Sequence, residues 1–201
     1  MLILASLRGI AVRGPMIGAQ HAYAHVRDWL GQPPPEPEPD VALGWLARRY
    51  LAGHGPATDY DLAKWAGLPV TWARRGLTAI AAELADRPDG LAELAGTVSP
   101  PVTPPPRLLG AFDPVLLGWA SRTQVLGEHQ EVVTVNGLFR PFALVAGRAV
   151  GTWVYQRGQV ELGTLEPVPG RVEAALAAEA SDVQRFLATE PASAPGADAE
   201  D

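Results

Sequence analysis

The sequence predicts an α+β fold: a winged helix-turn-helix unit followed by a small antiparallel β-barrel with a closing C-terminal helix. Three observations support this class. Apolar side chains recur at helical spacing through residues 41–85, short apolar runs separated by turn residues fill residues 107–165, and helical spacing returns over residues 171–188. Hydrophobic residues make up 47% of the 201 residues, which is enough for a sizeable core and excludes global disorder.

Two proline-rich stretches divide the chain. "QPPPEPEPD" (residues 32–40) and "SPPVTPPP" (residues 99–106) are typical of extended polyproline II and are incompatible with helix. We therefore expect five parts: a hairpin and helix (1–31), a linker (32–40), the helix-turn-helix domain (41–99), the barrel domain with its C-terminal helix (100–188) and a disordered acidic tail (189–201).

The N-terminal part is predicted to form a short hairpin around "RGP" and then a helix, "AQHAYAHVRDWLG". On a helix, His21 and His25 would share one face at a spacing that can bind a metal. The zinc-protease motif, however, places a glutamate after the first histidine, where this chain has Ala22, and no third ligand is evident. We predict no metal site.

The central part has the signals of a helix-turn-helix. A first helix, with its apolar face between Leu43 and Leu51, ends at the glycines and proline of residues 53–56. Thr58 and Asp61 fit a capping box that starts a second helix through Ala66. "GLP" then makes a tight turn, Thr71 can cap a third helix running to about Ala85, and "DRPDGLAELAGTVS" can form a small wing hairpin.

The third of these helices has a distinct outward face. Ala73, Leu77, Ile80 and Leu84 share the face expected to pack inward, whereas Thr71, Arg75 and Thr78 lie opposite, with Arg74 at the edge. In a DNA-binding helix-turn-helix this face enters the major groove, where arginine and threonine contact base edges and phosphates. The alternative is a solvated helix face without a partner.

The barrel is predicted from five short strands and a closing helix. The strands are residues 115–119, 131–135, 140–145, 149–156 and 160–165, with the turn pair Ala146-Gly147 joining the third and fourth. The closing helix, residues 171–188, has one apolar stripe: Val172, Leu176, Val183, Phe186 and Leu187.

Composition narrows the function classes. The chain has no cysteine, which excludes disulfides and thiolate chemistry, and its apolar N-terminus is interrupted by Arg8 and too short to span a membrane. We expect a cytoplasmic protein with no membrane partner. The net charge of −6 does not exclude nucleic acid, because residues 1–188 hold 16 basic and 18 acidic side chains, a net charge of −2. Nucleotide-binding glycine motifs are absent, so no cofactor is expected.

Two acidic positions could suggest chemistry. Asp113 precedes a proline and is expected to organise a turn. Glu128 and His129 are neighbours and could form an acid/base pair, although adjacent residues on a strand would face opposite ways. Neither is predicted to be catalytic.

Several separated motifs resemble the winged helix DNA-binding domain family, which includes the AlkZ-type DNA glycosylases that excise alkylated or crosslinked bases. The similarity runs from Leu7 to Leu187 through "LARRYLAGHGPATDYDLAKWAGLPVTWARRGL", "LLGAFDPVLLGW", "NGLFRPFALVAGRAVGTW" and "LEPV". It implies tandem winged-helix units followed by a β-barrel, with a concave surface for double-stranded DNA. Residues 1–31 would then be the remnant of a preceding winged-helix unit. Arg48, Arg140 and Arg148 join Thr71, Arg74, Arg75 and Thr78 as expected DNA contacts.

The sequence departs from the family in one respect. Active members carry a Gln-x-Gln or Gln-x-Asp motif in the first winged helix, and neither triplet occurs in this chain. The chain resembles the later part of such a protein, and no catalytic residue can be assigned. Three hypotheses follow: a DNA-binding protein without the catalytic motif, an active glycosylase if the native chain is longer or a separate chain supplies the motif, or a protein-interaction module that uses the helix-turn-helix surface.

Overall fold

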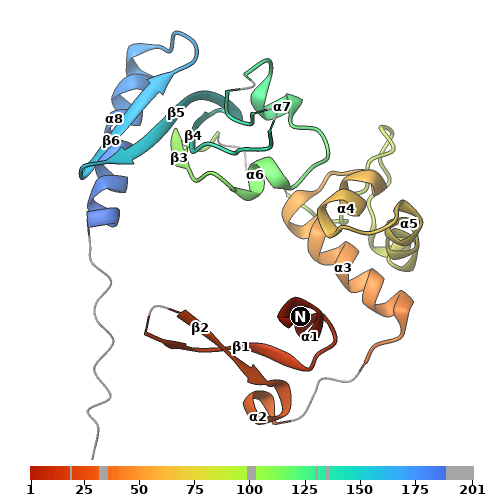
Figure 1. The fold of residues 1–201 in the computed structure, drawn as a ribbon. Helices are drawn as coiled ribbons and strands as arrows, with labels where there is room; N and C mark the ends of the chain where they lie inside the picture. Colours follow the sequence, from red (N-terminus) through yellow and green to blue (C-terminus); the bar gives the residue numbers. More distant parts are fainter. Residues whose placement is uncertain (19, 32–35, 99–102, 130, 135, 189–201) are drawn as a thin grey trace, which may run out of the picture. The chain divides into compact units, whose positions relative to one another are not determined.

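The computed structural model describes residues 1–18, 20–31, 36–98, 103–129, 131–134 and 136–188 (Figure 1). The chain divides into two compact units, Met1–Ala42 and Leu43–Asp201. The first half of the predicted proline linker, the predicted boundary between residues 99 and 100, and the predicted acidic tail lie outside the described residues. Within the described ranges, no helix is long and apolar enough to cross a membrane.

The first unit is a hairpin flanked by two short helices. It contains α1 (Leu2–Leu7), β1 (Ala11–Ile17), β2 (Gln20–His25) and α2 (Val26–Leu30), with β1 and β2 antiparallel. Val26 is the one buried residue in the described part of this unit.

The predicted helix from Ala19 onward is wrong over its first half. Residues 20–25 form β2, in which Ala22 and Ala24 are less exposed than their neighbours, so the inward side repeats every second residue. The "RGP" segment lies inside β1, at an irregularity in the pairing between Arg13 and Met16, rather than at the turn. The histidines are therefore not on a helix. His25 caps α2, its Nδ1 accepting the backbone N–H of Arg27 at 3.3 Å.

The helices of the second unit follow most of the predicted signals. They are α3 (Pro39–His54), α4 (Asp59–Ala66) and α5 (Val70–Ala79), followed by the 3₁₀ turn Ala81–Glu83. The first four residues of α3, up to Ala42, belong to the first unit. Pro39 was expected in the linker but lies in the first turn of α3, where a missing N–H costs nothing. The capping box of Thr58 and Asp61 is confirmed: the threonine hydroxyl accepts from Asp61 N at 3.0 Å, and the carboxylate accepts from Thr58 N at 2.9 Å.

The boundaries of α5 differ from the prediction at both ends. The helix begins at Val70 after Pro69, so Thr71 lies within the first turn and is not the cap. It ends at Ala79 rather than near Ala85 because the following residues pair with a later segment. Leu84 forms an antiparallel bridge with Leu94, and Ala85 N donates to Glu93 O at 2.9 Å. Residues 84–95, hereafter the 84–95 hairpin, thus occupy the position of the predicted wing, and a second bridge joins Ala57 to Ala92.

The helices pack closely around one core. Its buried members are Ala47, Tyr50, Leu51, Ala57, Leu62, Ala63, Ala73 and Ile80. Helix α5 approaches α3 so closely that a Cβ on Gly76 would lie 2.7 Å from the carbonyl oxygen of Leu43. Glycine at this position is therefore a packing requirement.

The remaining strands form one antiparallel sheet in the order β3-β4-β5-β6. These are β3 (Arg107–Leu109), β4 (Phe142–Val145), β5 (Arg148–Gln156) and β6 (Gln159–Thr164). The predicted turn Ala146-Gly147 is confirmed. Its φ angles of 48° and 81° are both positive, as a two-residue type I′ hairpin turn requires.

A closed barrel is not formed by the described strands. The predicted strand 115–119 is helix α6 (Pro114–Leu117), because the Asp113 side chain accepts from Val115 N at 2.9 Å and a proline follows at the first helical position. The predicted strand 131–135 is reduced to one bridge between Val133 and Phe139, and Val135 lies outside the described residues. With two of the five expected strands missing, β3 and β6 are the edges of an open sheet.

Helix α8 (Gly170–Ala188) packs on this sheet and reaches both of its edges (Figure 1). Leu176 is fully buried, with Val172 and Val183 beside it, as predicted. Phe186 and Leu187 were placed on the same stripe but are 77% and 42% exposed. Polar side chains bind the edge strands: Glu179 accepts from Leu108 N at 3.4 Å on β3, and Gln184 accepts from Val160 N at 2.9 Å on β6.

The segment after α6 is joined to the helices of the second unit. The Tyr50 hydroxyl donates to the carbonyl oxygen of Gly118 at 2.8 Å, and the indole N–H of Trp119 donates to His54 O at 3.1 Å. Asp61 accepts from Ala120 N at 2.9 Å. The rings of Tyr50 and His54 are stacked, with centroids 4.9 Å apart. These contacts tie the helical core to the sheet.

Candidate nucleic-acid interface

The outward face of α5 has the composition predicted from its periodicity. Thr71, Arg75 and Thr78 are exposed, whereas Ala73 and Gly76 on the opposite side are buried. The three exposed side chains combine one cation with two hydroxyl groups on consecutive turns. Such a surface can donate hydrogen bonds to phosphates and to base edges.

Arg74, at the edge of this face, is bound within the protein. Its Nε lies 2.5 Å from Oδ2 of Asp59, in the first turn of α4, and its side chain remains 67% exposed. The pair fixes the direction of the guanidinium across the turn between α4 and α5. It also cancels the charge that Arg74 would bring to a phosphate.

Arg48 is similarly occupied. Its Nε and Nη2 donate to the two carboxylate oxygens of Glu83 at 2.6 and 2.5 Å. The hydrogen bonds to Arg48 lower the pKa of Glu83, and the same contact raises the pKa of Arg48. This two-pronged pair joins α3 to the 3₁₀ turn after α5, so Arg48 reinforces the helix packing.

A shallow pocket of about 460 Å³ borders α5. Thr78 and Arg74 line it from α5, Asp59 from α4, and Gly90 and Ala92 from the 84–95 hairpin. Its charged groups are the guanidinium of Arg74 and the carboxylate of Asp59, which are already paired with each other. The pocket therefore has little preference for an anion.

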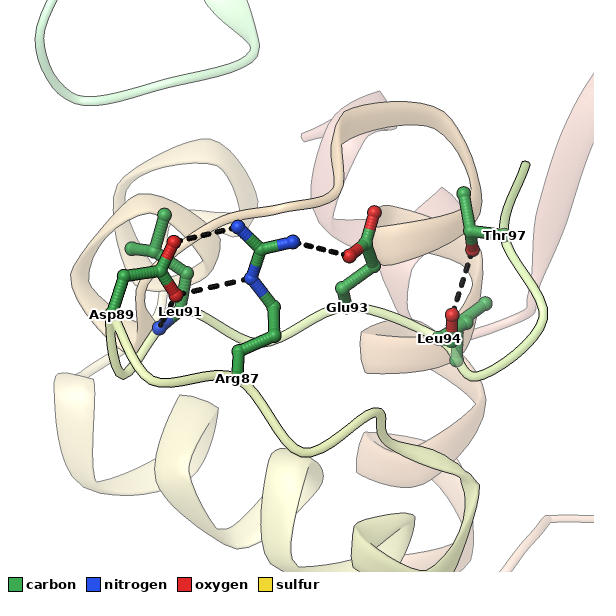
Figure 2. A network of polar contacts seen from close by, with 6 residues as sticks. All are labelled: Arg87, Asp89, Leu91, Glu93, Leu94 and Thr97. Atoms are coloured by element: carbon green, nitrogen blue, oxygen red, sulfur yellow. Dashed lines mark hydrogen bonds and ion pairs between the residues drawn. The ribbon is translucent and has the colours of Figure 1, made fainter. Parts of the chain in front are cut away.

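The 84–95 hairpin carries its own network of polar contacts (Figure 2). Arg87 lies between two carboxylates, with Nη2 2.6 Å from Asp89 and Nη1 2.5 Å from Glu93. Hydrogen bonds to Arg87 lower the pKa of Asp89, which also accepts from Leu91 N at 3.1 Å. With Asp86, three carboxylates and one guanidinium give residues 84–95 a net charge of −2. The ion pairs of Arg87 thus fix the conformation of the hairpin, while its net charge remains negative.

The arginines of the sheet lie in a different environment. Arg140 is exposed and precedes β4, and its backbone N–H donates to Val132 O at 2.9 Å. Arg148 opens β5 and lies against Gly127, where an added Cβ would be 2.7 Å from its Nη2. The structure also places Arg122 and Gly127 together in the wall of one pocket. No sequence pattern predicts that Arg122 and Arg148 both lie near Gly127, because 26 positions separate the two arginines.

The acidic candidates have structural contacts. Asp113 caps α6, as expected. His129 has its Nε2 3.5 Å from Glu166 rather than forming a recorded pair with Glu128. Among the described residues, no group of three or more histidine or carboxylate side chains is arranged to hold a metal ion. The predicted DNA contacts lie in three places: Thr71, Arg74, Arg75 and Thr78 on α5, Arg48 on α3, and Arg140 and Arg148 just before β4 and at the start of β5.

Comparison with known proteins gives a consistent result. The signature of a family described as DNA glycosylase AlkZ-like matches residues 2–186. The interstrand DNA cross-link repair glycosylase of Streptomyces sahachiroi is 30% identical over 163 residues, an alignment covering 73% of this chain and 43% of the relative. The solved structure of the Streptomyces sahachiroi DNA glycosylase AlkZ matches with a TM-score of 0.73 and 27% identity, covering 89% of this chain and 52% of the other. The chain therefore spans about half the length of these relatives.

Proposed function

Because the chain belongs to the AlkZ-like DNA glycosylase family, we propose that it is a winged-helix protein that binds double-stranded DNA. In this proposal α3, α4, α5 and the 84–95 hairpin form the winged helix, and the open sheet is a second DNA-facing element. The observation that carries the proposal is the outward face of α5, where Thr71, Arg75 and Thr78 are exposed on one side of a helix whose other side is buried.

We propose that base excision needs residues outside this chain. The Gln-x-Gln and Gln-x-Asp triplets are both absent from its sequence. The relatives whose names describe glycosylases are about twice as long as the matched region. A longer native chain, or a second polypeptide carrying the triplet, would make the assembly a DNA-repair glycosylase. An excision assay on crosslinked duplex, with the chain alone, should then give no product.

Salt dependence of duplex binding tests the DNA proposal. Neutralising a phosphate releases condensed counterions, so log K should fall with log salt by about 0.9 for each phosphate contacted. We expect Arg75→Ala to weaken binding of a fluorescent 20-base-pair duplex at 50 mM salt and to reduce this slope by about one contact. The matched control is Arg171→Ala, an exposed arginine on α8 outside the proposed surface. Binding by the parent chain that is equal at 50 and 200 mM salt, or equal effects of the two variants, would contradict the proposal.

A second function is favoured by the ion pairs around α5. Arg48 and Arg74 are both bound to carboxylates, and the neighbouring 84–95 hairpin has a net charge of −2. A surface with this balance of charge can also bind a protein partner. No binding to any duplex at 50 mM salt, together with a stoichiometric protein complex that is lost in Arg75→Ala, would select the interaction module over DNA binding.

A further inference from the structure

A second pocket lies beside the short helix α7 (Thr123–Leu126), apart from the face of α5. It is a shallow hollow of about 210 Å³ in the surface. Its wall is formed by Arg122, Thr123, Leu126, Gly127, His129 and Val133. This volume is smaller than that of typical cofactor pockets, so the pocket suits a small group rather than a whole nucleotide.

Arg122 is held in place by contacts that leave its outer end available. Its Nε donates to the carbonyl oxygen of Leu116 at 2.7 Å, and its Cζ lies 5.1 Å from the ring centroid of Phe139. No protein acceptor is recorded for either terminal amino group within the described residues. The guanidinium is thus positioned by the main chain and by an aromatic ring, and both terminal amino groups can donate to a ligand.

Arg148, at the start of β5, lies beside one residue of this wall. Gly127 lines the pocket, and an added Cβ there would lie 2.7 Å from Nη2 of Arg148. The backbone of Gly127 has φ 55° and ψ −120°, a conformation available to glycine and costly for other residues. The turn after α7 thus lets the guanidinium lie directly against the main chain. Neither Arg122 nor Arg148 forms an ion pair with any residue that the structure describes.

The remaining polar groups are compatible with a bound anion. Thr123 Oγ1 accepts from the Ser121 hydroxyl at 3.2 Å and keeps its own proton to donate. Glu166 lies 3.5 Å from His129 Nε2, and Glu128 stands between Gly127 and His129 in the sequence. The wall of the pocket, as far as the structure describes it, contains one guanidinium group, that of Arg122, and no carboxylate.

We propose that this pocket binds one phosphate group of the DNA backbone through Arg122, Arg148 and the hydroxyl of Thr123. Guanidinium groups match phosphate oxygens in geometry and form the stronger, charge-assisted hydrogen bonds. The inference rests on the proposed DNA-binding function but concerns a separate surface. It assigns the sheet unit its own contact with the duplex, beside the winged helix.

The test variant is Arg148→Met, which removes the charge and keeps a long side chain against Gly127. The control is Arg157→Met, the same exchange at an exposed arginine in the β5–β6 turn. We expect Arg148→Met to reduce the salt slope of duplex binding by about 0.9, so that its deficit shrinks about 3.5-fold between 50 and 200 mM salt. The control should keep the parent slope. Unchanged circular dichroism and unfolding midpoints show that both variants fold.

A second arm uses inorganic phosphate as the probe. The thermal unfolding midpoint is compared in phosphate and in chloride at equal ionic strength, for the parent chain and both variants. Phosphate should stabilise the parent and the control but not Arg148→Met. Parental salt slopes in Arg148→Met, with intact DNA binding, would overturn this pocket and leave the proposed function standing. Stabilisation by phosphate through Arg148 without any duplex binding would refute DNA as the source of the phosphate. Absence of both effects would refute the pocket altogether.

Discussion

Tyr50→Phe tests the junction between the helical core and the segment after α6. The Tyr50 side chain is fully buried, and its hydroxyl donates to the Gly118 carbonyl oxygen at 2.8 Å. Burial also raises the pKa of Tyr50 far above its ordinary value, so the phenol stays protonated and remains a donor. The substitution removes one oxygen and keeps the ring that stacks on His54 with centroids 4.9 Å apart.

The expected loss of stability arises because the Gly118 carbonyl oxygen loses its hydrogen-bond donor. Among the described residues no other donor bonds to the Gly118 oxygen, and Gly118 is buried. Leaving a buried acceptor unsatisfied costs about 1–3 kcal/mol. With a urea m-value of about 2 kcal/mol/M, the unfolding midpoint should fall by roughly 0.5–1.5 M.

Urea titration followed by tryptophan fluorescence is a suitable assay. Trp65 and Trp119 lie in the same ring cluster, at centroid distances of 5.7 and 5.3 Å from His54. Tyr60→Phe is the control, because that side chain is 57% exposed and should lose little. A midpoint for Tyr50→Phe within about 0.1 M of the control would refute the importance of this hydrogen bond, since it corresponds to about 0.2 kcal/mol.

Two further predictions concern local features. Burial alone would raise the pKa of Asp61, but hydrogen bonds from Thr58 and Ala120 outweigh it and lower the pKa below its ordinary value of 3.8. Ionised Asp61 therefore stabilises the fold fully above pH 3.8, and this contribution is lost as the pH falls through the lower folded pKa. The parent should lose stability more steeply than Asp61→Asn as the pH is lowered past 3.8, and parallel urea-midpoint profiles would be evidence against this. Ala146 has a φ of 48°, which costs an L-residue about 1 kcal/mol. Ala146→Asn should therefore raise the unfolding temperature by a few degrees, and a lower value would show that the turn has no such strain.

Local signals predicted the fold where a few neighbouring residues decide the conformation. The capping box at Thr58 and the turn at Ala146-Gly147 are of this kind, and both are confirmed. The errors arose where two local signals competed. The apolar run 115–119 favours a strand, but the cap at Asp113 and the following proline start a helix. Alanines around His21 favoured a helix, but pairing with β1 produced a strand.

The candidate site could likewise be predicted only where the spacing of residues within one helix decides it. Periodicity placed Thr71, Arg75 and Thr78 on the outward face of α5, and their exposure is confirmed. The ion pair of Arg48 with Glu83 joins residues 35 positions apart. Such partners are set by how α3 packs on the turn after α5, which the spacing of residues within one helix does not specify. The proximity of Arg148 to the pocket beside α7 depends in the same way on sheet pairing.

Helix α8 gives the open sheet a protection that a barrel would obtain by closure. An edge strand exposes unpaired N–H and C=O groups that can recruit strands from other molecules. Glu179 and Gln184 occupy N–H groups on β3 and β6, one on each edge. The sheet therefore depends on its last helix for resistance to self-association. Without residues 170–188 both of these N–H groups would be unpaired, and we expect the sheet then to recruit strands from other molecules.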